Sequence, residues 1–360
     1  MNNFSADKPS PKQLGYRMPA EWEPHGATWL SWPHNRDTWP DKIELVEEIW
    51  VQMVKAISPQ EKVCLLVNDD EERLEAFARL TRAGVRMDNV AFYEIPTVDV
   101  WMRDYGPTFV VGGNTKTAPL AFNDWIFNGW GNKYPEYNDD DGVAKAIARL
   151  LGVPVFEHRI ILEGGSIEVN GRGTCLTTEQ CLLNPNRNPR LAQSEIEDIL
   201  RASLGVDHFI WLGEGIVGDD TDGHIDDIAR FVDPTTVVCA CEEDPRDENY
   251  CLLRENYERL QGARDQDGRK LTIVKLPMPG KVEYEGARLP ASYANFYIAN
   301  GAVLVPTYDH ANDKRAIGIL AELIPDRKVA GIPCAPLVIG LGAIHCVTQQ
   351  QPMAENSFRP

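Results

Sequence analysis

The stretch Trp101-Met102-Arg103-Asp104-Tyr105-Gly106-Pro107 (residues 101–107) is the first of four segments that are unusually dense in reactive or conformationally special residues. The other three are Glu163-Gly164-Gly165-Ser166, Asp222-Gly223-His224-Ile225-Asp226 and Ile344-His345-Cys346. Asp104 and Glu163 are 59 positions apart, Glu163 and His224 are 61 apart, and His224 and Cys346 are 122 apart, which is twice 61. Such spacing is typical of a ring of similar supersecondary units, each delivering one loop to a common centre. The length of the chain allows about five such units.

The sequence around these segments alternates short apolar runs with amphipathic stretches. We expect helices at 41–58, 71–82, 141–151, 194–203, 248–260 and 312–323. We expect strands at 63–67, 90–95, 159–162, 173–177, 237–241, 271–276, 302–305 and 346–348. No Gly/Ser-rich or charged linker divides the chain. The pattern therefore predicts one continuous α/β body, with a loose N-terminal arm at 1–15 and a single domain at 16–360.

Composition and charge narrow the class of protein. Hydrophobic residues make up 43% of the chain and charged residues 25%, which is the balance of a soluble globular protein and excludes a disordered, collagenous or coiled-coil protein. The 36 basic and 54 acidic residues give a net charge of −18. Proteins that bind nucleic acids or anionic membranes carry basic patches, so we expect neither as a partner. A negative field favours cationic partners, although the same charge also serves solubility.

The cysteine content and the N-terminus favour a reducing, cytoplasmic location. Eight cysteines in 360 residues, with no Cys-x-x-Cys pair, do not make a disulfide framework or a zinc ribbon. Residues 1–15 are polar and lack the apolar core of a signal peptide. No apolar run approaches the roughly 20 residues that a membrane span needs.

Cys346 is the candidate nucleophile. It follows the glycine-rich run Gly340-Leu341-Gly342, and glycines permit tight backbone bends and close approach of a substrate. The alternative is an inert buried thiol, which is the ordinary state of a cytoplasmic cysteine. We assign that alternative to the other seven cysteines.

His224 is the candidate acid/base, because an imidazole exchanges protons near neutral pH. Five aspartates lie within residues 218–227 around it. An EF-hand calcium loop would place Gly223 at position 6 and a glutamate at position 12, where this chain has Ala229, so that pattern fails. A catalytic metal site of the His/Asp type stays open as an alternative, although no second histidine is nearby in the sequence.

The remaining carboxylates suit a guanidinium. Its planar fork of N–H donors is matched by carboxylates, and Asp104 and Asp226 could surround such a group while the thiolate approaches its electron-poor carbon. Glu163 could hold the imidazole or join this cradle. The alternatives are a salt bridge of Asp104 with Arg103, and a turn in which Glu163 faces water.

Nearly the whole chain, from 15 to 352, resembles the agmatine deiminases of the guanidino-group-modifying superfamily, which are often grouped with bacterial-type peptidyl-arginine deiminases. The segments that carry the resemblance are 15–22, 101–107, 162–167, 177–189, 221–226, 291–297 and 345–352. The resemblance implies an α/β propeller (pentein) of five ββαβ-type units around a pseudo-fivefold axis, in agreement with the spacing. The chain departs from the family pattern at Ala343, where we expect glycine or asparagine.

Residue roles follow from the same resemblance. It implies that Cys346 is the nucleophile, that His224 is the general acid/base and that Glu163 orients this imidazole. Asp104 and Asp226 would be the guanidinium carboxylates.

The implied reaction is hydrolysis of agmatine to N-carbamoylputrescine and ammonia through a covalent thiouronium intermediate on Cys346. It needs no metal or organic cofactor, and it belongs to arginine metabolism and polyamine (putrescine) biosynthesis. Because the acidic run beside His224 suits an ammonium, we take Asp220 as the candidate for binding the substrate tail and Trp101 as a wall beside it.

Several interpretations stay open. Peptidyl-arginine or free arginine would be deiminated by the same chemistry. A cation-binding module with a degenerate site and a metal-dependent hydrolase are the other classes. The expected ligand is a small cationic guanidino compound, and a homo-oligomer is compatible with the sequence.

Overall fold

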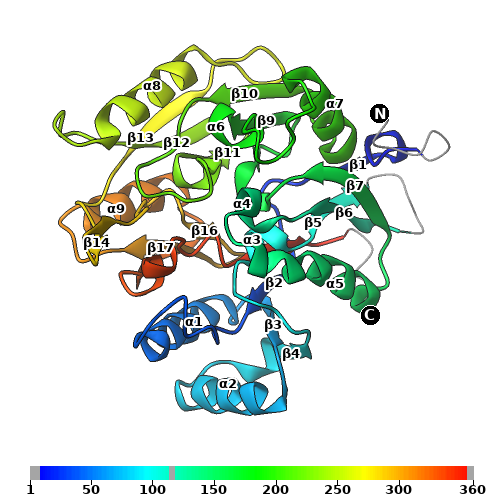
Figure 1. Cartoon of the computed structure of the whole chain (residues 1–360), viewed down its shortest axis with the longest axis vertical. Helices are drawn as coiled ribbons and strands as arrows, with labels where there is room; N and C mark the ends of the chain where they lie inside the picture. Colours follow the sequence, from blue (N-terminus) through cyan, green and yellow to red (C-terminus); the bar gives the residue numbers. More distant parts are fainter. Residues whose placement is uncertain (1–8, 113–117, 355–360) are drawn as a thin grey trace.

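The computed structural model describes residues 9–112 and 118–354 (Figure 1). Its strands form five sheets of three or four strands and one short hairpin. Within these described ranges, no helix combines the length and the apolar character needed to cross a membrane. The long helices lie toward the outside of the molecule and the short α3 and α4 toward its middle.

The five larger sheets repeat one pattern. In each sheet an antiparallel pair is followed by a strand that runs parallel to the second member of the pair, and a helix connects the two parallel strands. A strand–helix–strand connection of this kind buries the apolar stripe of the helix against the sheet. The pattern agrees with the sequence expectation of repeated α/β units.

Each of the five sheets combines its strands with one or two helices. The first sheet holds β19 (Gln349–Pro352), β2 (His25–Ser31), β3 (Lys62–Val67) and β4 (Val90–Glu94), with α1 (Ile43–Ile57) and α2 (Asp70–Arg82). The second holds β1 (Tyr16–Arg17), β5 (Thr108–Gly112), β6 (Leu120–Ile126) and β7 (Val155–Ile161), with α5 (Val143–Leu151). The third holds β8 (Glu168–Val169), β9 (Thr174–Thr178) and β10 (His208–Leu212), with α7 (Gln193–Leu204). The fourth holds β11 (Ala229–Asp233), β12 (Thr236–Cys241) and β13 (Thr272–Pro277), with α8 (Asn249–Gly262). The fifth holds β16 (Tyr297–Ile298), β17 (Ala302–Thr307) and β18 (Lys328–Pro333), with α9 (Asp313–Leu323).

Short elements complete the chain. They are the hairpin β14 (Glu283–Tyr284) and β15 (Ala287–Arg288), the helices α3 (Met102–Tyr105), α4 (Gly129–Asn132) and α6 (Glu179–Leu182), and the 3₁₀ turns Lys12–Leu14, Met87–Asn89, Pro135–Gly142, Gly164–Ser166, Ile225–Asp227 and Leu337–Gly340.

The two ends of the described chain meet in the first sheet. β19 pairs antiparallel with β2, so that Gln349 lies opposite Trp29. This pairing fixes the segment just before β19, which contains Cys346, against the N-terminal part of the molecule. Of the N-terminal arm expected at 1–15, residues 1–8 lie outside the described residues. In the remainder, the Lys12 ammonium donates to the Val206 carbonyl at 3.2 Å.

The expected helices and most of the expected strands are confirmed, with ends that differ by a few residues. The strand expected at 346–348 is wrong. These residues form a turn, and β19 begins only at Gln349. The Thr348 hydroxyl donates to the carbonyls of Ile344 and His345, each at 3.0 Å, and these local bonds close the turn. The run of β-branched and apolar residues had indicated a strand instead.

Candidate active site

Five chain segments meet at the site, and each immediately precedes the first strand of one sheet's antiparallel pair. They are α3 before β5, the turn Gly164–Ser166 before β8, the turn Ile225–Asp227 before β11, residues 292–295 before β16 and residues 344–347 before β19. Neighbouring segments are bonded through their backbones: Arg103 N–H donates to the Cys346 carbonyl at 3.1 Å, and His345 N–H donates to the Asn295 carbonyl at 3.1 Å. The fold therefore gathers segments that are far apart in the sequence.

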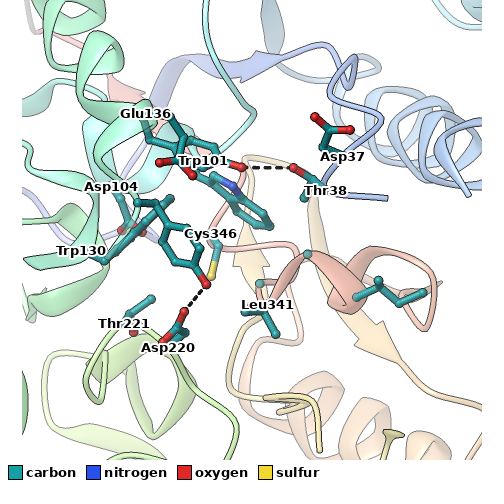
Figure 2. A pocket seen from close by; sticks show the side chains of 15 residues that line it. Asp37, Thr38, Trp101, Asp104, Trp130, Glu136, Asp220, Thr221, Leu341 and Cys346 are labelled. Atoms are coloured by element: carbon teal, nitrogen blue, oxygen red, sulfur yellow. Dashed lines mark hydrogen bonds between the residues drawn. The ribbon is translucent and has the colours of Figure 1, made fainter. Parts of the chain in front are cut away.

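Cys346 lines a pocket of about 320 Å³ and is only 6% exposed. Figure 2 shows its sulfur in the middle of the pocket, with Asp104 and Trp130 on one side and Leu341 on the other. Burial and the nearby charges of Asp226, Asp227 and Asp104 raise the pKa of the Cys346 thiol well above its ordinary value. The pocket by itself therefore keeps this thiol neutral, and a cation placed among the carboxylates would reverse that effect.

Asp104 is held by two donors at the wall of the pocket. The Trp130 indole N–H donates to Oδ2 at 2.9 Å, and the Gly165 N–H donates to Oδ1 at 3.0 Å. Burial raises the pKa of Asp104 to about 6, against the opposing charge of His224. Arg103, its sequence neighbour, points elsewhere and donates to Gln350 at 2.8 Å, so the alternative of an Asp104–Arg103 salt bridge is not what the structure contains.

Trp130 reaches Asp104 from an unusual backbone. Residues 129–132 have φ values of 58°, 53°, 82° and 61°, so four consecutive residues are left-handed. Two of them are glycines, for which this region carries no steric penalty, whereas Trp130 is strained there. Trp130 was not among the residues predicted from the sequence, although the Asn-Gly-Trp-Gly-Asn run is a turn signal that points to it.

The glycines of the Glu-Gly-Gly-Ser segment leave room for the site. A β-carbon on Gly165 would lie 2.6 Å from His224 Nδ1 and 2.8 Å from Asp104 Oδ1. One on Gly164 would lie 2.1 Å from the Arg103 carbonyl oxygen. Only glycine lets the three segments come this close.

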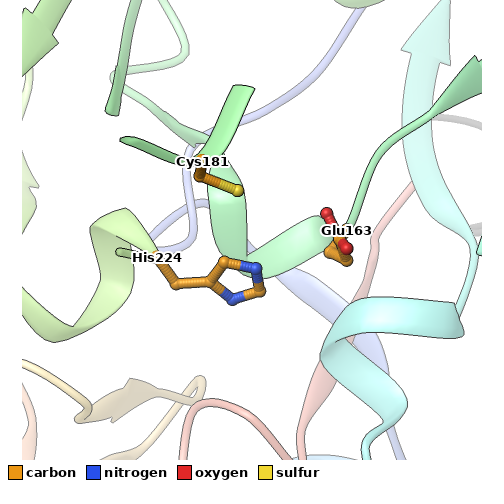
Figure 3. Close-up of side chains that lie close together, drawn as sticks. All are labelled: Glu163, Cys181 and His224. Carbon is orange, nitrogen blue, oxygen red and sulfur yellow. The ribbon is translucent and has the colours of Figure 1, made fainter. Parts of the chain in front are cut away.

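His224 lies beside Glu163 and Cys181 in the interior (Figure 3). One ligand-type atom from each of the three side chains lies within 4.8 Å of the others. Neither nitrogen of His224 has a hydrogen-bond partner among the described residues, and its Nδ1 is 3.7 Å from Asp104 Oδ1. Although burial opposes it, the charge of Asp104 and the neighbouring Cys181 raise the pKa of His224 well above its ordinary value.

Glu163 is engaged by Arg187 rather than by the imidazole. Arg187 Nε donates to Glu163 Oε1 at 2.8 Å, and both side chains are buried. Among the described residues, no hydrogen bond joins the His224 ring to Glu163, the carboxylate that the resemblance implies as its orienting partner. Instead, Arg187 keeps Glu163 in place beside the ring. The role of Arg187 was not predicted. Its segment, 177–189, contributed to the family resemblance, but the resemblance assigned no function to any side chain in it.

The Glu163, Cys181 and His224 cluster has the donor types that zinc accepts. The guanidinium of Arg187, 2.8 Å from Glu163, places a permanent cation beside it. A neighbouring positive charge opposes the binding of a divalent cation. The three donors are of the types that bind a metal, but the positive charge of Arg187 beside them disfavours a divalent cation.

Asp226 faces both the nucleophile candidate and His345. Its Oδ2 lies 2.7 Å from His345 Nδ1 and 3.8 Å from the Cys346 sulfur. Its Oδ1 is buried and has no hydrogen-bond partner among the described residues. Burial opposes ionisation, but the hydrogen bond and charge of His345 hold the pKa of Asp226 below its ordinary value.

Asn295 is a site residue that was not predicted from the sequence. Its amide nitrogen donates to the Cys346 sulfur at 3.2 Å and to Asp227 Oδ1 at 3.0 Å, and its amide oxygen accepts from His345 N–H at 2.9 Å. Residues 292–295 are the fifth of the converging segments and fall inside the doubled interval between His224 and Cys346. That interval was the signal that could have pointed to them.

The two residues proposed for the substrate tail, Trp101 and Asp220, both line the pocket. A β-carbon on Gly342 would lie 2.4 Å from the Trp101 ring, so glycine is needed where the nucleophile loop passes this wall. Asp220 is partly engaged: Tyr134 donates its hydroxyl to one oxygen, and Lys133 Nζ lies 3.3 Å from the other. Asp37 and Glu136 add exposed carboxylates to the lining.

Ala343 does not disturb the nucleophile loop. The residue with positive φ in this loop is Leu341, at 69°, and Ala343 is not among the positive-φ residues of the described chain. The position therefore does not require glycine.

The repeated sheets and this pocket define a class: a mixed α/β protein with a buried thiol in a carboxylate-lined site suited to a small cation. Comparison with known proteins narrows the class. The family model described as Porphyromonas-type peptidyl-arginine deiminase matches residues 17–352, so the chain belongs to that family.

Individual relatives agree with this assignment. The agmatine deiminase of Medicago truncatula is 40% identical over 374 residues, covering 95% of this chain and 98% of that protein. The solved structure of an agmatine deiminase of Enterococcus faecalis matches with a TM-score of 0.88 at 35% identity, covering 97% of this chain and 99% of the other. An amidinotransferase from Microseira wollei, with a TM-score of 0.51 at 12% identity and coverage of 96% and 100%, shares the fold alone. The mixed α/β fold is thus that of the agmatine deiminases and is related to the amidinotransferase fold.

Proposed function

We propose that this chain is an enzyme that hydrolyses the guanidinium of agmatine, giving N-carbamoylputrescine and ammonia. The observation that carries the choice of substrate is the charge of the pocket lining. Its described residues include four carboxylates, those of Asp37, Asp104, Glu136 and Asp220, and no lysine, arginine or histidine. Agmatine has a cation at each end, so both ends suit this lining. Arginine adds a carboxylate, and Lys133, the cation beside Asp220, is already paired with Asp220 at 3.3 Å and with Asp222 at 2.8 Å. The relatives named agmatine deiminases support the same choice.

Asp104 and Asp226 hold the guanidinium in this proposal. The free Oδ1 of Asp226 is a buried acceptor without a donor among the described residues, and Asp104 is ionised most easily when a cation is next to it. The substrate supplies N–H donors and a positive charge to both carboxylates. The same charge lowers the pKa of the Cys346 thiol, whose pKa is raised by the surrounding carboxylates in the free protein.

Covalent catalysis then proceeds in two stages. The Cys346 thiol loses its proton to solvent as the guanidinium binds, and the thiolate forms a bond to the guanidinium carbon. His224 then donates a proton to one nitrogen, and the bond from carbon to that nitrogen breaks to release ammonia. The neutral His224 next takes a proton from water, the hydroxide adds to the thiouronium carbon, and the carbon–sulfur bond breaks to free the thiolate. The added hydroxyl loses its proton to the released ammonia, which leaves the neutral N-carbamoyl product and an ammonium ion. The net reaction consumes one water and yields one ammonium ion. Glu163 is the carboxylate that orients His224 in this proposal, and its bond to Arg187 holds it beside the ring.

We also propose how the sheets close, which residues contact the substrate tail and where in the cell the reaction takes place. The five sheets are proposed to close as five ββαβ-type units around a pseudo-fivefold axis, with the five converging segments at its centre. Trp101 and Asp220 contact the substrate tail, together with Asp37 and Glu136 at the mouth of the pocket. All eight cysteines lie within the described residues and are unpaired, which supports a reducing cytoplasm. The product belongs to polyamine biosynthesis from arginine.

A substrate panel tests the proposal directly. Purified protein is incubated with agmatine, free arginine or an arginine-containing peptide, and ammonia release is measured with Cys346→Ser as the matched blank. We expect kcat/KM to be highest for agmatine. Faster turnover of arginine or of the peptide would refute the choice of substrate. Loss of activity on chelation, with recovery on adding metal, would replace the cysteine mechanism with a metal-dependent one.

A further inference from the structure

We propose that His345 is a positioning residue, an imidazolium held between Asp226 and Glu21 that fixes the Asp226 carboxylate and leaves one of its oxygens free to accept from the substrate. The inference rests on the proposed role of Asp226 in holding the guanidinium. It gives a role to the N-terminal segment 15–22, which the mechanism otherwise leaves unused.

The contacts of the His345 ring require two donated protons. Nδ1 lies 2.7 Å from Asp226 Oδ2, and Nε2 lies 2.8 Å from Glu21 Oε2. All three side chains are less than 5% exposed. An ionised carboxylate oxygen only accepts hydrogen bonds, so a ring with one at each nitrogen donates twice and carries a positive charge. The pKa of Asp226 and the pKa of Glu21 are both held below their ordinary values, against the effect of burial, which is consistent with two ionised partners.

The ring divides the two oxygens of Asp226 between two tasks. Oδ2 is taken by His345, and Oδ1 is buried without a partner among the described residues. A carboxylate free to rotate would offer either oxygen to any donor. Because His345 holds Oδ2, the carboxylate cannot rotate freely: Oδ2 stays 3.8 Å from the Cys346 sulfur, and Oδ1 is left as the acceptor for a guanidinium N–H.

Glu21 is in turn anchored from behind. Its Oε1 lies 2.8 Å from Arg230 and accepts from the Ile298 N–H at 2.8 Å, while Arg103 lies 3.4 Å from its Oε2. Arg230 also pairs with Glu168 at 2.8 Å.

Charges therefore alternate from the pocket into the interior, from Asp226 through His345, Glu21 and Arg230 to Glu168. At the Asp226 end, this row is also faced by Cys346, Asp227 and His224. Each buried charge has a partner of opposite sign, which is the condition under which such a row is stable.

Two substitutions at His345 separate positioning from bulk structure. His345→Leu removes both donors, whereas His345→Asn keeps an amide N–H near the place of Nδ1 and so keeps the bond to Asp226. We expect kcat/KM for agmatine to fall by about ten- to a hundredfold in His345→Leu, with most of the loss in KM, and to recover at least partly in His345→Asn. The dissociation constant for agmatine, measured in the Cys346→Ser background, should follow the same order.

A spectroscopic readout tests the charge state without turnover. In protein labelled with ¹⁵N-histidine, the ring resonances of His345, assigned by their loss in His345→Asn, should show a proton on both nitrogens in the folded protein. A ring nitrogen of His345 without its proton would overturn the inference.

The matched control for the binding measurements is His158→Gln. His158 is a buried histidine on β7 whose Nε2 bonds to Asn123 at 2.8 Å, and its replacement should leave agmatine affinity unchanged.

Further outcomes distinguish this inference from the proposed function. If His345→Leu does not fold, Glu21→Gln tests the same row, and we expect a several-fold rise in KM from the loss of the charge behind the ring. Equal losses in His345→Leu and His345→Asn, or unchanged agmatine binding in Glu21→Gln, would overturn the positioning role while wild-type turnover still supports the function. No ammonia release by the wild-type protein would overturn the function and, with it, this inference.

Discussion

Replacing Trp130 with phenylalanine removes one hydrogen bond from Asp104 and keeps an aromatic ring in the cluster that packs around this position. The indole N–H donates to Asp104 Oδ2 at 2.9 Å, and both side chains are less than 10% exposed. A hydrogen bond to a charged group contributes about 1.5–3 kcal/mol, which at 1.36 kcal/mol per unit is about one to two pKa units. Burial raises the pKa of Asp104 to about 6 in the intact protein. The variant should therefore have an Asp104 pKa of about 7 to 8. Phenylalanine has the same β-carbon as tryptophan, so the left-handed backbone at this position is no worse.

The sign of the effect on activity follows from the charge that the substrate needs. The ionised form of Asp104 binds the guanidinium, so a higher pKa moves the acid limb of the kcat/KM profile to higher pH by about one to two units. At pH 7, the rise in the Asp104 pKa lowers the ionised fraction of Asp104 about two- to tenfold, so kcat/KM should fall by about the same factor, and the loss should shrink as the pH rises. The assay is ammonia release from agmatine across a pH series. Trp125→Phe is the control, because its indole donates to the neutral Thr108 hydroxyl at 3.0 Å. An acid limb that stays in place in Trp130→Phe would refute the reasoning.

Three further predictions use the same assay. Cys346→Ser should abolish turnover and leave thermal unfolding unchanged, because a serine hydroxyl is not ionised near neutral pH; measurable turnover would remove the thiol from the mechanism. Asp226→Asn should lower kcat/KM for agmatine at least about tenfold, since a buried charge facing the guanidinium is lost, and near-normal kinetics would contradict the guanidinium cradle. Gly165→Ala should lower kcat about tenfold or more, because the new β-carbon would lie 2.6 Å from His224 Nδ1. Gly142→Ala is its control, since nothing lies within 4 Å of that β-carbon, and equal losses in both would dismiss the steric argument.

Most of the secondary structure could be predicted because its signals are local. The apolar spacing of α1 (Ile43–Ile57), for example, is visible in fifteen consecutive residues. The spacing of reactive segments by about 61 positions also predicted which segments meet, since each precedes the same kind of strand. The turn at Cys346–Thr348 was mistaken for a strand because a hydroxyl bond within the turn has no signature in hydrophobicity.

The partners of the site residues could not be predicted, because they are distant in the sequence. Glu21 reaches His345 across 324 positions, and Arg187 binds Glu163, the carboxylate that we had expected to orient the imidazole. No periodicity encodes such pairs, which depend on how whole sheets pack together. Asn295 lies in the doubled interval and Trp130 in a turn motif, but neither of these weak signals predicts which residue the side chain contacts.

The left-handed run at residues 129–132 also bears on how the pocket meets its substrate. A β-carbon on Gly129 would lie 2.2 Å from the Tyr134 carbonyl oxygen, and one on Gly131 would lie 2.3 Å from the Asn186 amide, so the surroundings leave this run little freedom to relax. The free-energy cost of the strained backbone at Trp130 is therefore part of the folding free energy, before any ligand binds. A substrate that enters finds the donor to Asp104 already in place and loses none of its binding free energy to ordering that wall. The wall acts as a template whose cost lies in the folding equilibrium, while its benefit appears in the affinity for the guanidinium.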